Sequence, residues 1–193
     1  MSRRPTLKSA ICPALTFAFA LCLVGCGEET PDPNVHQEID AISGATGGEP
    51  DHLVPVCCDY GLEERRLADE LFALLNAYRA ENGLEALERD DGLDRAMQGH
   101  CHHMAIHPFF DHIAPEEALA SPWTRAQLCG SSASGENIAA GQSSATAVME
   151  SWKSSPGHNA NMLDAGFRRV GVGAFVSPEG APYPLYWGQL FGR

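Results

Sequence analysis

The sequence predicts an α+β domain in which helices pack on an antiparallel sheet. Two observations lead to this fold class. In three segments, 63–81, 92–107 and 144–154, apolar residues recur at three- and four-residue steps, which is the period of an amphipathic helix. Near the C-terminus the period changes, and 170–176 and 183–191 are strand-like segments joined by a turn.

Each predicted helix carries its own signals. The first begins with carboxylates near the positive end of the helix dipole and is followed by Asn82-Gly83, which ends it. Pro108 follows the second and disfavours helical geometry in the residue before it. The apolar positions that we expect to face the core are, helix by helix, Leu67, Leu71, Leu74, Leu75 and Tyr78; Leu93, Ala96, Met97 and Met104; and Val148, Met149 and Trp152.

Length and composition restrict the function. The chain has 193 residues, 44% of them hydrophobic and 20% charged, which is enough for one domain of ordinary size with some additional length. The 13 Lys and Arg residues against 25 Asp and Glu residues give a formal net charge of −12. Because nucleic-acid binding draws on clustered cations, we expect no nucleic-acid partner.

The N-terminus has the organisation of an export signal. Basic residues precede an apolar run over 10–24 that is too short for a comfortable membrane span. The stretch Leu23-Val24-Gly25-Cys26 resembles the lipobox of bacterial lipoproteins, which implies cleavage after residue 25 and acylation of Cys26. The alternatives are an ordinary secretory signal with an incidental cysteine and an uncleaved signal anchor. The lipoprotein interpretation predicts export and lipid anchoring to the bacterial cell envelope, facing the periplasm or the cell surface.

Residues 26–60 are expected to be a tether, and 61–193 the folded domain. The tether is acidic and rich in Pro and Gly, a composition that cannot form a core of its own. Removal of 1–25 takes away three basic residues and no acidic one, so 10 basic and 25 acidic residues remain and the net charge becomes −15. We therefore expect the lipid, rather than surface charge, to hold the protein on its membrane.

The seven cysteines divide into groups with different expected roles. Two leave with the signal and Cys26 carries lipid, so four remain in or beside the domain: Cys57, Cys58, Cys101 and Cys129. Adjacent Cys57 and Cys58 form a strained ring if bonded to each other, so each is expected to bond outward, to Cys101 and Cys129. The alternative is that one pair is reduced and buried.

Two groups of residues are candidates for chemistry. His100, His103 and His107 lie on one face of the second helix and could bind a transition metal together, although solvated or core-edge side chains are the simpler interpretation. His112, Glu136 and His158 lie in three separate turn-like segments, 109–112, 135–138 and 154–158. Two imidazoles and a carboxylate can form an open metal site or a general acid and base pair. Glu136 as a backbone cap and Pro156-Gly157 as a plain turn are the structural alternatives.

A series of short motifs follows a fixed order over 61–193. These motifs are Asn76-Ala77-Tyr78-Arg79, Gly83-Leu84, His100 with Met104, Phe109-Phe110-Asp111-His112, Arg125, Gly135-Glu136-Asn137-Ile138, Trp152 with Ser155-Pro156-Gly157-His158, Asn161-Met162-Leu163, Val170-Gly171-Val172-Gly173 and Tyr186-Trp187 with Gln189 and Phe191. Their order resembles that of the bacterial branch of the CAP superfamily, which comprises cysteine-rich secretory proteins, antigen 5 and pathogenesis-related 1 proteins and is also called the SCP domain. The resemblance covers 61–193.

The resemblance implies a three-layer α-β-α sandwich, with a short antiparallel sheet between helical layers and a cleft on one side. Family members line this cleft with two histidines and two acidic residues, and some bind zinc or another divalent cation there. His112 and His158 match the histidines and Glu136 matches one acidic residue. The second acidic position is occupied by Ser155, which removes one carboxylate and counts against a hydrolytic mechanism that needs two.

Two classes of function follow from the resemblance. The first, which we favour, is a non-enzymatic module that binds a lipid, a glycan or a similar ligand in the cleft. The second is a metal-assisted hydrolase, such as a peptidase or a cell-wall hydrolase, in which His112 and His158 hold the ion and Glu136 acts on a water molecule as the catalytic residue. The family has no common reaction that decides between them.

Overall fold

The computed structural model describes residues 56–107 and 109–193. The predicted signal peptide, Cys26 and the tether up to residue 55 lie outside the described residues. Among the described helices, none combines the length and the apolar character needed to cross a bilayer. The elements are, in chain order, α1 (Leu62–Glu81), β1 (Glu88–Arg89), α2 (Asp91–Ile106), the 3₁₀ helix η1 (Glu117–Leu119), α3 (Pro122–Leu128), β2 (Gly135–Ala140), α4 (Ala145–Ser154), α5 (Pro156–Met162), β3 (Arg169–Val176) and β4 (Leu185–Gly192).

The sheet has four strands in the order β1-β3-β4-β2. The strands β3 and β4 form the predicted C-terminal hairpin, and β2 pairs antiparallel with β4 so that Glu136 lies opposite Leu190. The strand β1 joins β3 in parallel through two residues, so the sheet is mixed at this edge rather than wholly antiparallel. The expectation of a purely antiparallel sheet is therefore wrong at β1, which is too short to show a strand pattern in the sequence.

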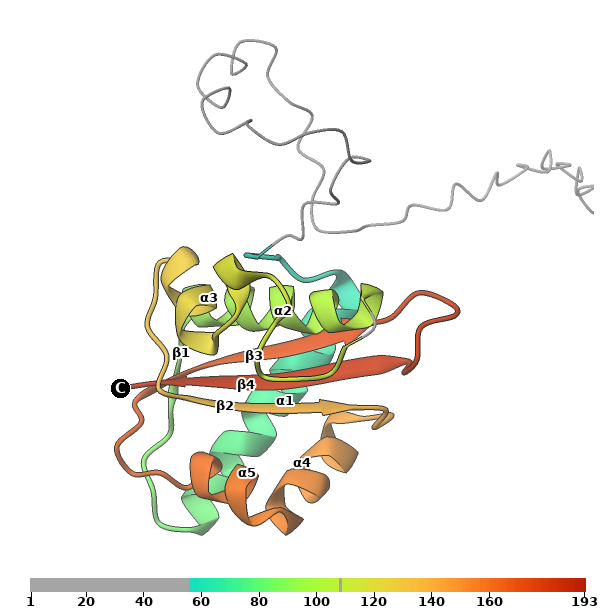
Figure 1. Ribbon diagram of the computed structural model, residues 1–193. Coiled ribbons are helices and arrows are strands. Elements are labelled where there is room, and N and C mark those ends of the chain that lie inside the picture. The colour runs from blue at the N-terminus through green and yellow to red at the C-terminus, as the bar shows by residue number, and fades with distance from the viewer. Residues whose placement is uncertain (1–55, 108) are drawn as a thin grey trace, which may run out of the picture.

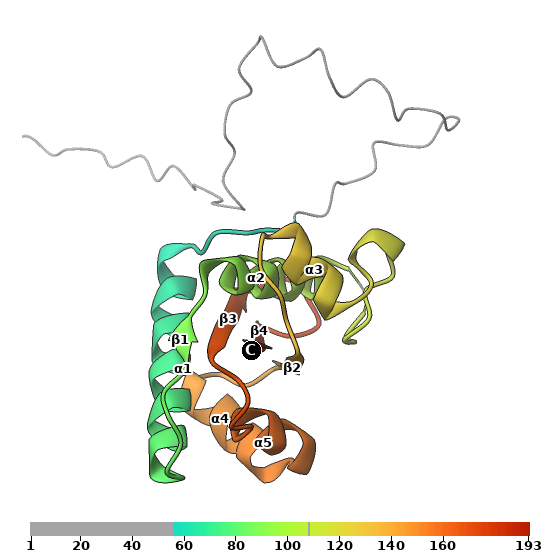
Figure 2. The same ribbon diagram turned by 90° about the vertical axis from the view of Figure 1, so that its left-hand side faces the viewer.

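Helices cover both faces of the sheet, which confirms the α-β-α sandwich (Figures 1 and 2). One face packs against α2 and α3, through a cluster that includes Met97, Ile138 and Leu190. The other face packs against α1, α4 and α5. Side chains from alternate positions of the same strands therefore enter two separate cores.

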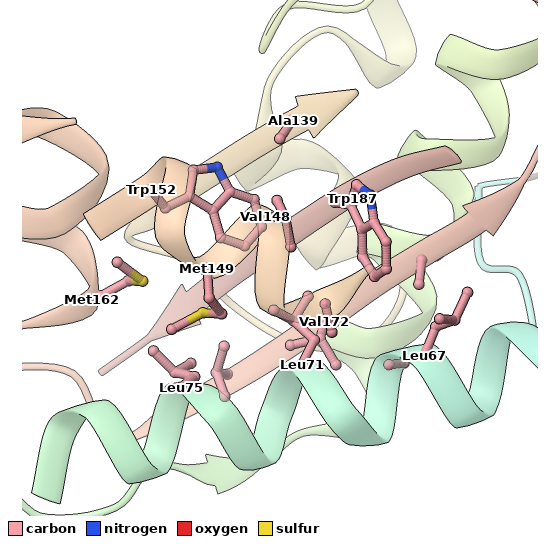
Figure 3. Close-up of a cluster of buried hydrophobic side chains, with 14 of the residues drawn as sticks. Leu67, Leu71, Leu75, Ala139, Val148, Met149, Trp152, Met162, Val172 and Trp187 are labelled. Carbon is pink, nitrogen blue, oxygen red and sulfur yellow. The ribbon is translucent and has the colours of Figure 1, made fainter. Parts of the chain in front are cut away.

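The core between the sheet, α1 and α4 contains the largest buried side chains (Figure 3). Leu71 and Leu75 of α1 meet Val148 and Trp152 of α4 over the sheet. The buried indole of Trp152 donates its N–H to the Ile138 carbonyl at 3.3 Å. The buried indole of Trp187 donates to the Gln142 carbonyl at 2.8 Å. Burial of each aromatic ring is thus achieved without an unpaired donor.

Glycines on the opposite face of the sheet allow α2 to approach it closely. A Cβ added to Gly171 would lie 2.1 Å from the backbone carbon of Leu93, and one added to Gly173 would lie 2.8 Å from the Sγ of Cys101. The alternation Val170-Gly171-Val172-Gly173 therefore has a physical meaning. Its valines fill one core, and its glycines leave room for the helix backbone on the other side.

Three elements differ from the sequence-based expectation. The 135–138 segment, expected to be a loop, is part of strand β2, and the Ser154–His158 region runs directly from α4 into a further helix, α5. Helix α3 was not expected. The strand β2 is buried along almost its whole length and so lacks the alternation that identifies a half-exposed strand. The helices α3 and α5 have seven residues each, too few to show a helical period.

The cysteine pairing was predicted in part. Cys57 forms a disulfide with Cys129 that closes a sequence separation of 72 residues and ties the start of the domain to the end of α3. The expected bridge to Cys101 is wrong, because Cys101 is a free, fully buried thiol. It lies on the sheet-facing side of α2 against Gly173, whereas Cys58 sits near the start of α2, with its N–H bonded to the Arg95 carbonyl.

Candidate functional site

Three elements bring the predicted cleft residues to one end of the sheet. His112 lies on the loop after α2, Glu136 is the second residue of β2 and His158 lies in the first turn of α5. Asp111 shapes the loop locally, since its Oδ1 accepts the N–H of Ile113 at 2.8 Å. Pro156 at the first position of α5 starts that helix with a suitable backbone geometry.

Glu136 is held by two cationic or proton-donating partners. Its Oε1 lies 2.7 Å from Nδ1 of His112, and its Oε2 accepts a hydrogen bond from Nη2 of Arg125 at 2.8 Å. The carboxylate is 3% exposed, whereas the His112 side chain is 48% exposed. Because a carboxylate only accepts, Nδ1 of His112 carries the proton and its Nε2 is left as the nitrogen with a free lone pair.

Arg125 joins the His112 loop to the sheet. Its buried guanidinium donates to the carbonyls of His112, Leu119 and Ala120 at 2.9 to 3.2 Å as well as to Glu136. The planar guanidinium thus donates hydrogen bonds to three backbone carbonyls and one carboxylate. Arg125 is one of the family motifs in the sequence, but no local pattern indicates its contact with Glu136.

Amide side chains position His158. Asn137 Nδ2 donates to the His158 carbonyl at 3.1 Å and to Oε1 of Gln189 at 2.9 Å. Asn161 Nδ2 in turn donates to Oδ1 of Asn137 and to the Glu136 carbonyl. Since Asn137 is fully buried, its satisfied hydrogen bonds fix the spacing between β2 and α5.

Helix α1 holds the other side of α5. The hydroxyl of Tyr78 donates to Oδ1 of Asn159 at 2.9 Å. Arg79 is buried and donates to the carbonyls of Met162 and Asp164 at 2.8 and 3.1 Å. The Asn76 to Arg79 motif thus supports the helix that carries His158, which no periodicity in the sequence would have indicated.

The two imidazoles differ in electrostatics. The hydrogen bond to Glu136 raises the pKa of His112 above its ordinary value. Burial lowers the pKa of His158, and the nearby His112 lowers it further. The hydrogen bond to Glu136 thus favours the protonated form of His112, and burial favours the neutral form of His158. Nε2 of His112 has a free lone pair only in the neutral ring, so a cation that binds there competes with a proton.

Ser155 occupies the junction of α4 and α5. Its N–H donates to the Trp152 carbonyl at 3.1 Å, and its own carbonyl accepts from Asn159 at 2.8 Å. In this position it continues the backbone into α5 three residues before His158 but brings no negative charge. Glu136 is accordingly the one acidic member of the predicted cleft set.

The predicted cleft set would offer a divalent cation at most two protein ligands, the imidazoles of His112 and His158. Within the part of the chain that the structure describes, no group of three His, Cys, Asp or Glu side chains is arranged to hold a metal. Nε2 of His112 and the ring of His158 are the donors available, because both oxygens of Glu136 are engaged. Glu136 instead has the geometry of an outer partner that orients a ligating histidine.

The second histidine group does not form a metal stripe on the surface of α2. His100 and His103 are 1% and 2% exposed. His100 Nε2 lies 3.0 Å from the Asp111 carbonyl, and His103 packs edge-on against His107 and Phe109. The core-edge interpretation of these residues is the one that agrees with the structure.

The α-β-α sandwich is the fold expected of a CAP domain, and comparison with known proteins agrees. Residues 72–191 match the family model described as CAP, the cysteine-rich secretory protein family. The match covers more than half of the chain, and the chain belongs to this family.

Two proteins of Bacillus subtilis are similar in sequence. YkwD is 35% identical over 102 residues, which make up 52% of this chain and 39% of YkwD. The membrane protein YlbC is 27% identical over 104 residues, which make up 54% of this chain and 30% of YlbC. The chain thus spans less than half the length of these curated relatives.

Solved structures share the fold. An extracellular SCP-domain protein from Bacillus anthracis is 27% identical with a TM-score of 0.61, over 70% of this chain and 44% of that protein. An outer surface protein from Borrelia burgdorferi, 18% identical, has a TM-score of 0.59 over 67% of this chain and 93% of its own. The second likeness concerns the fold alone.

Proposed function

We propose that the chain is an exported binding module of the cell envelope, anchored through lipid on Cys26, whose CAP domain holds a lipid, a glycan or a similar ligand without chemical turnover. The cleft contributes His112 and His158 as ligand contacts. The description of the Bacillus anthracis relative as an extracellular protein supports export, and the apolar run before Cys26 supports the anchor.

The observation that carries the proposal is the engagement of Glu136. One of its oxygens meets His112 and the other meets Arg125. A general base needs an oxygen directed at a water or substrate proton, and here that oxygen has to leave a buried ion pair. With Ser155 at the second acidic position, the cleft lacks the pair of carboxylates that a hydrolase of this kind would use.

A divalent cation such as Zn²⁺ is included in the proposal. Nε2 of His112 and the imidazole of His158 would hold it, and when bound it would act as a Lewis acid toward an oxygen atom of the ligand. Glu136 keeps the proton of His112 on Nδ1 and so keeps Nε2 directed outward. Arg125 neutralises Glu136 and prevents the carboxylate from competing as a ligand.

Native mass spectrometry of the chain purified from membranes tests the proposal. We expect a co-purified small molecule that is lost from the His112→Ala/His158→Ala variant, and no hydrolysis of peptide or cell-wall substrates with or without added Zn²⁺. The intact mass of the N-terminal peptide reports acylation of Cys26. Metal-dependent turnover that disappears in Glu136→Gln would overturn the binding function and support the hydrolase.

A further inference from the structure

The loop that carries His112 rests on two buried histidines of α2. His100 Nε2 lies 3.0 Å from the carbonyl oxygen of Asp111, the residue immediately before His112. One turn further along the helix, Nε2 of His103 lies 3.1 Å from Oε2 of Glu116, on the other side of His112 in the sequence. Both contacts connect the second helix with the loop, and neither belongs to the cleft itself.

The contact of His100 determines the protonation of its ring. A carbonyl oxygen only accepts, so Nε2 of His100 must carry the proton. Its Nδ1 is buried and has no hydrogen-bond partner among the residues that the structure describes. A second proton there would have no acceptor and would lie near Arg125, and burial together with that charge lowers the pKa of His100 well below its ordinary value. His100 is thus a neutral donor with one tautomer.

His112 needs such support because its own side chain is not enclosed. With 48% of the side chain exposed, packing does not confine the imidazole to one rotamer. Its carbonyl is held by Arg125 at 3.2 Å, and the carbonyl before it is held by His100 at 3.0 Å. Two fixed carbonyls in succession set both peptide planes around His112, and these planes decide where its Cβ points.

We infer that His100 is a positioning residue for His112: through the Asp111 carbonyl it holds the loop so that Nδ1 of His112 meets Glu136 and Nε2 is left for another ligand. Its consequence for cation or ligand binding rests on the function proposed above, whereas its consequence for the geometry of His112 does not. The inference also explains why a histidine is tolerated in the core at this place. The imidazole supplies a buried N–H donor at the position from which this helix reaches the loop carbonyl.

The tautomer of His112 is the direct test. In the full chain without added metal, at a pH where the ring is neutral, nitrogen NMR should show His112 protonated on Nδ1, because that nitrogen donates to Glu136. A neutral histidine exposed to water prefers the proton on Nε2. In His100→Leu, which removes the donor, we expect His112 to change to the Nε2-protonated form while circular dichroism shows a folded domain.

Matched variants separate positioning from general destabilisation. His100→Gln places an amide N–H near the original Nε2 and should restore the Nδ1 form of His112, whereas His100→Asn, whose shorter amide does not reach as far, should not. Met104→Ala, another buried change on α2, should lower stability without changing the tautomer. If His100→Leu fails to fold, the difference in the His112 tautomer between His100→Gln and His100→Asn still tests the positioning role. Retention of the Nδ1 form in a folded Leu variant or in both amide variants overturns the inference.

Binding measurements are kept apart from this test. If His112 and His158 hold Zn²⁺, His100→Leu should weaken Zn²⁺ binding by about ten- to hundredfold, the range seen when an outer partner of a metal ligand is removed. A wild-type chain that binds no Zn²⁺ but shows the expected tautomers would refute the metal part of the proposed function and leave the positioning role standing. A wild-type chain that binds Zn²⁺, together with a His100→Leu variant in which His112 keeps the Nδ1 tautomer, would support the metal part of the proposed function and refute the positioning role.

Discussion

Nδ1 of His112 lies 2.7 Å from Oε1 of Glu136, within hydrogen-bond distance. The contact joins a half-exposed ring on a loop to an almost fully buried carboxylate on β2. The partner of the second oxygen is Arg125, which is equally buried. Changes on either side of this contact should therefore affect stability, protonation and the cleft together.

Glu136→Gln should destabilise the domain by roughly 3 kcal/mol or more, because it leaves the buried guanidinium of Arg125 without a counter-charge. Urea unfolding followed by circular dichroism measures the change. The matched control is Glu150→Gln, which breaks the exposed pair with Lys153 and should cost no more than about 0.5 kcal/mol. Equal effects of the two variants would show that the Glu136 pair is not the source of stability.

His112 should add a pH-dependent contribution to stability. Since its pKa is raised in the folded state above 6.5, the contact with Glu136 stabilises fully below about pH 6.5 and is lost as the pH rises through the folded pKa. The difference in unfolding free energy between the wild type and His112→Gln should accordingly be larger at about pH 5.5 than at about pH 8.5. His158 is present in both chains, so the part of its opposite pH dependence that comes from burial cancels. A difference that is constant across this range would contradict the prediction.

The disulfide between Cys57 and Cys129 should be a major source of stability. It closes a separation of 72 residues, for which the chain-entropy model gives about 4 kcal/mol. The double variant Cys57→Ala/Cys129→Ala should unfold at lower urea by a corresponding amount. Peptide mapping after alkylation without reductant provides an internal check, since Cys101 should be modified only after unfolding. Alkylation of Cys101 in the native protein would mean that α2 does not pack closely enough on the sheet to shield this thiol.

Gly171→Ala should be strongly destabilising, because its Cβ would lie 2.1 Å from the backbone of Leu93 and the helix would have to move away from the sheet. Overpacking of this kind costs about 1 to 3 kcal/mol or more. Gly157→Ala is the control: a Cβ there has open space, and alanine favours the helix α5, so stability should be unchanged or raised. Thermal unfolding of both variants decides. A neutral Gly171→Ala would show that α2 does not lie directly on β3.

Periodicity predicted the long elements and missed the short or fully buried ones. Helices α1, α2 and α4 begin and end within one or two residues of the segments expected, and the β3–β4 hairpin was recognised. The strand β2 was not predicted, because both its faces are covered and the alternation of apolar and polar residues that indicates a strand is absent. The helices α3 and α5 are shorter than the window over which a helical period can be recognised.

The cleft residues His112, Glu136 and His158 were identified through the order of motifs, and local spacing alone did not favour a site over turns and caps. Arg125 and Asn137 were visible as motif members, but their partners were not. Arg125 meets Glu136 from a separate helix, and Asn137 meets Gln189 because β2 and β4 pair in a particular register. Such partners depend on side-chain reach in three dimensions, which sequence separation does not encode.

Local periodicity and residue identity were enough to predict the α+β class, the two long amphipathic helices, the C-terminal hairpin and the lack of an acidic residue at Ser155. Three contacts could be known only from the packed fold: Cys129 rather than Cys101 pairs with Cys57, Glu136 is shared between His112 and Arg125, and His100 lies 3.0 Å from the Asp111 carbonyl. These contacts join segments that are brought together by packing on both faces of the sheet, and their chemistry exists only once the layers have assembled.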